Sequence, residues 1–184
     1  MRRYCLIGIK GIGKTTLIKT ILEEIPSIDY LIGSQILRQL VGPRFDNFDY
    51  FPAEEKQKYR EKAIEYMIKR QNETQKDILV DGHTTLYNPI SNEPENVFTD
   101  LDCKFFTDLI LYEVNALIVL ERRKSDSIKK RILDLSIIKN ELSFERENSE
   151  NIAKKYGMQM HYLNEDFHNN LNIELIKILK GEMM

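Results

Sequence analysis

A glycine-rich segment near the N-terminus carries the strongest chemical signal in the chain. It reads Gly-Ile-Lys-Gly-Ile-Gly-Lys-Thr over residues 8–15, between an apolar run and an amphipathic helical pattern. Glycine permits backbone conformations that are closed to other residues, so backbone N–H groups can approach phosphate oxygens closely. The helix that follows directs the positive end of its dipole at the same anion. This spacing predicts a loop that binds a nucleoside triphosphate.

The side chains that follow the last glycine have separate predicted roles. Lys14 is expected to reach the β- and γ-phosphates, and the Thr15 hydroxyl is a predicted Mg²⁺ ligand. Thr16 is expected to add a contact to the α-phosphate. ATP and Mg²⁺ are therefore the predicted cofactors, and the predicted cofactor-binding residues of the loop are Gly8, Gly11, Ile12, Gly13, Lys14, Thr15 and Thr16.

Asp81 and His83 come directly after a second buried apolar run, residues 78–80. Ligands of open α/β sheets bind at the carboxyl ends of the strands. An Asp in this position either organises the Mg²⁺ site or orients an attacking hydroxyl, the alternative being a plain turn residue. His83 either hydrogen-bonds a reacting group or is structural. We interpret both as candidate catalytic residues and Asp81 also as a metal-site residue, whereas His161 and His168 are interpreted as structural or surface residues.

Short apolar runs alternate with longer helical patterns along the chain, which is typical of βαβ units and a parallel sheet. Residues 82–96, rich in Asn, Pro, Ser and Thr, are expected to form a long loop. The predicted strands are 4–7, 30–32, 78–80, 116–120 and 158–163, and the predicted helices are 15–25, 34–41, 52–71, 98–112, 125–135, 143–156 and 173–179.

Composition limits the class of protein. The 184 residues, 42% of them hydrophobic and 30% charged, suit one soluble globular domain over residues 1–184. The net charge of -2 gives no basic field, so direct binding to nucleic acid is not expected. Cys5 and Cys103 lack metal-ligand spacing and are interpreted as reduced thiols. The sequence contains neither a signal peptide pattern nor an apolar run that could span a bilayer, which predicts a cytoplasmic location.

The glycine-rich segment together with the Asp-x-His stretch Val80-Asp81-Gly82-His83 resembles a known family. It is similar to the archaeal-type adenylate kinases and to the nuclear adenylate kinase of eukaryotes that acts in ribosome assembly. The resemblance implies a three-layer P-loop NTPase fold of the α/β class, with a five-stranded parallel sheet flanked by helices. It also implies a region that binds a nucleoside monophosphate over about residues 34–70 and a short lid over about 134–144.

The same resemblance implies further site residues. Gly33, Ser34 and Arg38 correspond to the region that contacts the monophosphate, and the loop that includes Asn164 corresponds to the segment that packs on adenine. Lids of this family usually carry paired arginines, whereas residues 135–141 contain one basic side chain, Lys139. Arginine clamps a phosphoryl group with two hydrogen bonds and lysine does not. Either Arg131 or Arg146 therefore substitutes from nearby, beside Lys139, or phosphoryl transfer is weak.

Three functions remain open at this point. The preferred hypothesis is a nucleoside monophosphate kinase that uses ATP, a monomer or small homo-oligomer with a small nucleotide as its partner. A second is a kinase of a nucleoside or another small hydroxyl compound, in which Asp81 would act as a general base. A third is a nucleotide-dependent binding switch with slow ATP hydrolysis, which the sparse basic character of residues 135–141 favours.

Overall fold

The core of the protein is a five-stranded parallel sheet. The computed structural model describes residues 1–127, 131–166 and 170–182. The strand order is β2-β3-β1-β6-β7, and every pairing in this sheet is parallel. The predicted sheet is confirmed, and its strands are β1 (Arg3–Ile7), β2 (Ile28–Ile32), β3 (Asp77–Asp81), β6 (Asp108–Glu113) and β7 (Gln159–Asn164).

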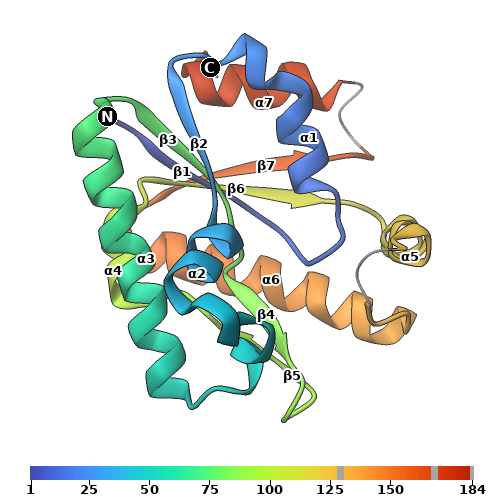
Figure 1. Ribbon diagram of the computed structural model, residues 1–184. Coiled ribbons are helices and arrows are strands. Elements are labelled where there is room, and N and C mark those ends of the chain that lie inside the picture. Colours follow the sequence, from blue (N-terminus) through green and yellow to red (C-terminus); the bar gives the residue numbers. More distant parts are fainter. Residues whose placement is uncertain (128–130, 167–169, 183–184) are drawn as a thin grey trace.

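Helices cover both faces of the sheet and make a three-layer domain (Figure 1). One face is covered by α1 (Lys14–Ile21) and α7 (Leu171–Lys180), and the other by α3 (Ala53–Thr74), α4 (Asp100–Phe105) and α6 (Leu135–Tyr156). The remaining helices are α2 (Gly33–Val41), α5 (Ala116–Ser125) and the 3₁₀ segments η1 (Leu22–Glu24) and η2 (Gly42–Tyr50). In the described ranges, none of these helices combines the length and apolar character needed to cross a bilayer.

Strand β1 is central to the core because both of its faces are covered. Tyr4 and Leu6 pack in the cluster that includes α1 and α7, whereas Cys5 and Ile7 pack in the cluster that includes α3, α4 and α6. Successive side chains of a strand point to opposite faces, so a continuous apolar run is what a doubly covered strand requires. The end of β1 is thereby fixed where residues 8–15 leave the sheet.

The prediction of one helix over residues 98–112 is wrong. Helix α4 covers Asp100–Phe105 alone, and β6 follows at Asp108–Glu113. A capping box between Thr99 and Asp102 starts the helix. The apolar residues from 109 to 112 satisfy helical spacing and also suit a fully buried strand, which periodicity alone does not distinguish. The strand is chosen by pairing with β1 and β7 on its two sides.

The prediction of a strand over residues 116–120 is also wrong, because these residues begin α5. The Asn115 side chain accepts a hydrogen bond from the backbone N–H of Leu117 and caps the helix. Leu117 is 57% exposed and Ile118 is 37% exposed, whereas Val119 is fully buried. A run that looked like a central strand is therefore a surface helix with one buried side.

Two other segments are more regular than the sequence indicated. Residues 82–96, expected as a loop, contain a hairpin of β4 (Thr85–Asn88) and β5 (Glu93–Asn96). Asn92 turns the hairpin with a positive φ of 57°. Residues 136–142, which separate the predicted helices 125–135 and 143–156, lie within the continuous helix α6. The predicted helix over residues 125–135 is wrong in its described part, because residues 126–127 and 131–134 are not helical; residues 128–130 lie outside the described residues.

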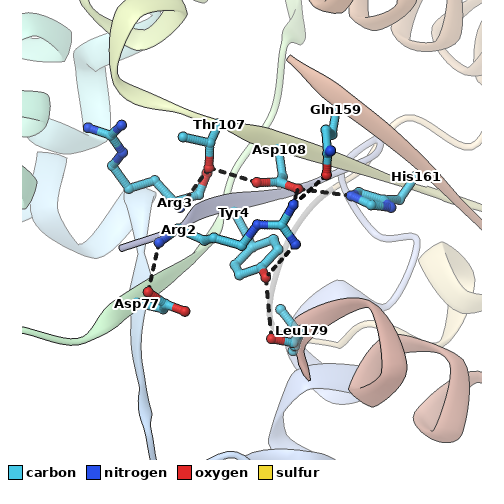
Figure 2. A network of polar contacts seen from close by, with 9 residues as sticks. All are labelled: Arg2, Arg3, Tyr4, Asp77, Thr107, Asp108, Gln159, His161 and Leu179. Carbon is cyan, nitrogen blue, oxygen red and sulfur yellow. Dashed lines mark hydrogen bonds and ion pairs between the residues drawn. The ribbon is translucent and has the colours of Figure 1, made fainter. Parts of the chain in front are cut away.

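A polar network links the amino-terminal ends of the strands, opposite the end where residues 8–15 leave β1 (Figure 2). Asp108 is fully buried. Its carboxylate lies 3.0 Å from His161 Nε2 and 3.4 Å from Arg2 Nη2, and it accepts a hydrogen bond from the Thr107 hydroxyl at 2.7 Å. Burial alone would raise the pKa of Asp108, but the bonds from His161 and Thr107 outweigh it and lower the pKa.

We expect Asp108→Asn to lower the free energy of unfolding at pH 7 by about 2 kcal/mol, since hydrogen bonds to a charged acceptor contribute about 1.5–3 kcal/mol. A carboxylate with a depressed folded pKa stabilises above its unfolded pKa of about 3.9, and this contribution is lost as the pH falls through the folded value. Urea denaturation should therefore show the difference between wild type and variant shrinking below about pH 4. Asp46→Asn, at an exposed pair, is the control, and a difference that does not vary with pH would contradict this account.

Candidate active site

Residues 8–15, called the glycine loop from here on, connect β1 to α1 through conformations that only glycine adopts readily. The φ angles are +146° at Gly8, +86° at Gly11 and +111° at Gly13. A Cβ on Gly8 would also lie 2.8 Å from the carbonyl oxygen of Tyr112. Gly13 precedes the first turn of α1, whose backbone N–H groups have no partner within the helix. The backbone therefore has the shape that an anion-binding loop requires.

Lys14, Thr15 and Asp81 meet at the carboxyl ends of β1 and β3. Lys14 is 5% exposed, and its Nζ donates to the carbonyl oxygen of Gly8 at 2.5 Å and lies 3.8 Å from Asp81 Oδ1. The Thr15 hydroxyl donates to Asp81 Oδ2 at 2.5 Å. Burial lowers the pKa of Lys14, and the charge of Asp81 opposes that shift. The structure thus brings together three residues that the sequence selected separately.

His83 lies beside the same ammonium group. Its Nδ1 is 3.5 Å from Lys14 Nζ. Burial, followed by the charge of Lys14, lowers the pKa of His83 well below its ordinary 6.5. The ring is therefore neutral at pH 7. An ammonium group only donates hydrogen bonds, so Nδ1 is the acceptor in its contact with Lys14. A hydrogen bond between the ring and the backbone of Gly8 opposes the lowering of the pKa.

The donor set at this position fits a triphosphate with Mg²⁺. Thr15 and Asp81 offer the hard oxygen ligands that Mg²⁺ prefers, alongside phosphate oxygens and water. The hydroxyl of Tyr30 lies at the same position, beside Thr15. Burial and then the charge of Asp81 raise its pKa, which places the hydroxyl near that carboxylate. In the described part of the chain no cluster of three or more His, Cys, Asp or Glu could hold a metal by itself.

Two arginines of α5, which the sequence analysis missed, hold the glycine loop by its carbonyl groups. Arg123 is buried and donates through Nε and Nη2 to the carbonyl of Lys10, at 3.0 and 2.7 Å. Arg122 donates through Nη1 to the carbonyl of Ile12. The sequence analysis missed these arginines because it interpreted residues 116–120 as a strand. Interpreted as a helix, residues 116–125 place Arg122 and Arg123 in the last turn of a short helix after β6.

Each of these arginines also has a carboxylate partner. Arg122 Nη2 lies 2.9 Å from both carboxylate oxygens of Glu165, which follows β7. Arg123 pairs with the buried Glu141 of α6 at 2.8 Å. The carboxylates fix the guanidinium groups, so the loop is fastened to α5, to α6 and to the end of β7.

The predicted lid residues lie in different surroundings. Arg131 forms an ion pair with Asp126 at 3.1 Å, and its Cδ would lie 3.2 Å from a Cβ placed on Gly11. Arg131 therefore packs beside the glycine loop. Lys139 is exposed in the first turns of α6, and Arg146, further along that helix, binds a carboxylate of β6. Closure of residues 134–144 as a lid stays a prediction.

The predicted acceptor residues lie at the start of α2. A Cβ on Gly33 would lie 3.3 Å from the carbonyl oxygen of Asp81, so the first turn of α2 touches the end of β3. Ser34 is exposed. Arg38 is also exposed and pairs with Asp46 of η2 at 3.0 Å. Gly33 is thus next to the candidate site, whereas Arg38 is held by a partner within its own region.

The buried Lys56 and the partly exposed Arg60 line a cavity that the sequence analysis did not anticipate. The cavity, of about 330 Å³, lies between the first half of α3 and the segment from β5 to α4. Lys56 lies 3.0 Å and Arg60 3.6 Å from the one carboxylate of Glu95. Arg38 of α2 and the pair Lys56 and Arg60 of α3 thus all have acidic partners.

The remaining predicted contacts lie around the ends of α1 and β7. Thr16 is exposed in the first turn of α1. Asn164 is the last residue of β7, and its Oδ1 accepts a hydrogen bond from the backbone N–H of Asp166 at 2.8 Å. The proposed contacts of these residues with nucleotide stay predictions. His168 lies outside the described residues.

Fold and site together define a class of protein. A family model described as an AAA domain matches residues 7–137, a range that runs from the end of β1 to the start of α6. The chain belongs to this family. No curated protein sequence matches it.

Comparison with solved structures identifies the fold as the α/β P-loop kinase fold. A shikimate kinase from Bacteroides thetaiotaomicron superposes with a TM-score of 0.58 at 16% identity, covering 98% of this chain and 97% of that one. A shikimate kinase from Aquifex aeolicus has a TM-score of 0.58 at 17% identity, with the same coverage. A deoxyadenosine kinase from M. mycoides with bound dATP has a TM-score of 0.57 at 17% identity, covering both chains fully.

We expect Lys14→Ala to weaken ATP binding about 100-fold, which corresponds to about 3 kcal/mol, because the variant loses a charge-assisted hydrogen bond to phosphate. Calorimetric titration with a non-hydrolysable ATP analogue and Mg²⁺ measures the change. Lys19→Ala, an exposed position on the same helix, is the control. Equal affinity of Lys14→Ala and wild type would show that the glycine loop does not hold the triphosphate.

Proposed function

We propose that this protein is a phosphotransferase that moves the γ-phosphoryl group of ATP to a small acceptor molecule. The observation that carries the proposal is the convergence of Lys14, Thr15, Asp81 and His83 at the carboxyl ends of β1 and β3. A binding loop without chemistry would not need a buried carboxylate and a neutral imidazole beside its lysine. Membership of the AAA domain family and the kinase fold support the proposal.

The chain's own groups would act mainly by position and charge. The glycine loop and the start of α1 would hold the phosphates through backbone N–H groups, and Lys14 would place a positive charge where negative charge develops. Thr15 and Asp81 would hold Mg²⁺, which supplies charge neutralisation between the phosphates. Arg131, which packs beside the loop, is the candidate for a second cation at the transferring group. The exposed Lys139 would contribute only through movement of the first turns of α6.

His83 would act as a fixed hydrogen-bond donor. A neutral imidazole donates through its one ring N–H without adding a second charge beside Lys14. Its contacts with Lys14 Nζ and with the backbone of Gly8 would fix the ring orientation before substrates bind. In this role His83 does not remove a proton. No base is needed when the oxygen that accepts the phosphoryl group is already anionic.

A nucleoside monophosphate is our first candidate for the acceptor. The close approach of Gly33 to the end of β3 puts the first turn of α2 beside Asp81, where an acceptor phosphate would face the donor. Arg38 would bind that phosphate by exchanging Asp46 for it. The exchange is inexpensive because an exposed ion pair contributes only about 0–1 kcal/mol.

A hydroxyl compound is the second candidate. Two of the solved structures with this fold are kinases of shikimate and one is a deoxyadenosine kinase, and neither acceptor is a nucleoside monophosphate. Asp81 would then orient the attacking hydroxyl. Its Oδ1 faces Lys14 and its Oδ2 binds Thr15, so that task requires the carboxylate to change partners.

An acceptor panel separates these functions. ATP turnover by the wild-type protein would be measured with nucleoside monophosphates, nucleosides, shikimate and water alone as acceptors. We expect a monophosphate to raise turnover at least about 100-fold above water, because a positioned acceptor gains that much from orientation alone. Stimulation only by hydroxyl compounds would favour the second candidate. Turnover that no acceptor changes would reject the kinase and leave a nucleotide-dependent switch.

We expect His83→Ala to reduce kcat about 100-fold and to change ATP affinity by less than about threefold, because loss of one aligned donor acts mainly on the transition state. His161→Ala is the matched control, since the same residue type there lies at the opposite edge of the sheet and affects stability only. Equal losses of kcat and affinity in His83→Ala would indicate a structural role.

A further inference from the structure

A buried carboxylate on α6 contacts both halves of the candidate site. Glu145 is 1% exposed. Its Oε1 accepts hydrogen bonds from the backbone N–H groups of Gly8 and Thr84, each at 3.1 Å. Its Oε2 accepts from the backbone N–H of Thr85 at 2.7 Å and from the Thr85 hydroxyl. Four donors from two segments remote from α6 in the sequence therefore converge on one side chain.

These contacts close a ring of hydrogen bonds around the reacting groups. Gly8 is held at its N–H by Glu145 and at its carbonyl by Lys14. Lys14 Nζ lies next to His83 Nδ1, and the backbone N–H of Thr84, the residue after His83, donates to Glu145. The glycine loop and the end of β3 are thus fixed relative to each other by a third element.

The donors explain why the side chain is a carboxylate. All four groups around Glu145 donate hydrogen bonds, so an acceptor-only side chain satisfies them. The nearby positive charge is that of Lys14: burial lowers the pKa of Lys14, and after Asp81 the charge of Glu145 opposes that shift. Glutamine would turn an N–H₂ group towards at least one N–H and leave buried donors unpaired.

We propose that Glu145 is a positioning residue, which holds Gly8 and the segment after Asp81 in the one register that aligns Lys14 with His83. The inference rests on the phosphoryl transfer proposed above. Glu145 would touch neither substrate nor Mg²⁺, so it acts through the backbone of the residues that do. Its removal should disturb alignment for transfer more than binding of ATP.

The test compares Glu145→Gln with Glu147→Gln, an exposed position on the same helix. At a temperature where both are folded by circular dichroism, we expect Glu145→Gln to lower kcat about 100-fold with KM for ATP within about threefold, since displacement of reacting groups by about 1 Å costs that much. Glu147→Gln should match wild type. Equal kcat in the two variants, or loss of kcat and affinity together, would overturn the proposal.

Thr85→Val is a milder second variant, in case Glu145→Gln folds poorly. It removes one of the four donors, and we expect kcat to fall about fivefold with unchanged KM for ATP. An unchanged kcat would count against the proposal.

A readout without turnover separates this inference from the proposed function. Hydrogen exchange at the Gly8 and Thr84 amides of Glu145→Gln should accelerate about tenfold, because each amide loses its acceptor. A crystal structure of the variant should show Lys14 and His83 moved apart. Failure of the wild-type protein in the acceptor panel would reject the kinase. Unchanged exchange and unchanged Lys14–His83 geometry would reject positioning by Glu145, whatever the panel shows.

Discussion

The burial of one ammonium group is the constraint on which the rest of the site depends. Lys14 is almost completely enclosed at the end of β1, and removing a charge from water costs several kcal/mol unless partners replace the lost hydration. The carbonyl of Gly8, the carboxylate of Asp81 and the ring of His83 are those partners. All three partners must lie at the carboxyl ends of the strands. The neighbouring parallel strands β1 and β3 therefore end at the same level.

The glycine loop is stabilised from outside as much as by its own sequence. Its positive φ angles leave the backbone without regular secondary structure, so its polar groups need partners elsewhere. Arg122 and Arg123 bind its carbonyl groups, and Glu145 binds its first N–H. Donors and acceptors are thus divided between α5 and α6. This arrangement would keep the loop in its binding shape before a nucleotide arrives, which lowers the entropic cost of binding.

The proposed acceptor side is built differently. Its cations are already partnered, by an exposed carboxylate at Arg38 and by the shared Glu95 at Lys56 and Arg60. An anionic acceptor would therefore enter by exchange of ion pairs. The exposed pair can be exchanged at little cost, whereas Lys56 is buried and its pair with Glu95 is harder to break. This difference in burial would favour Arg38 of α2 as the group that recognises the proposed acceptor, and a structural role for Lys56 of α3.

The sequence by itself determined the glycine loop and the strands β1 and β3, because glycine spacing and continuous apolar runs are local signals. It also selected Asp81 as a site residue, from its place at the end of β3. Tertiary structure decided whether residues 109–112 and 116–120 became strand or helix, since a short apolar run suits either and the neighbouring strands make the choice. It alone brought Arg122, Arg123 and Glu145 to the loop, from more than 100 residues away in the chain. No pattern of spacing records which buried carbonyl or N–H a distant side chain will satisfy; that is fixed only when the helices pack.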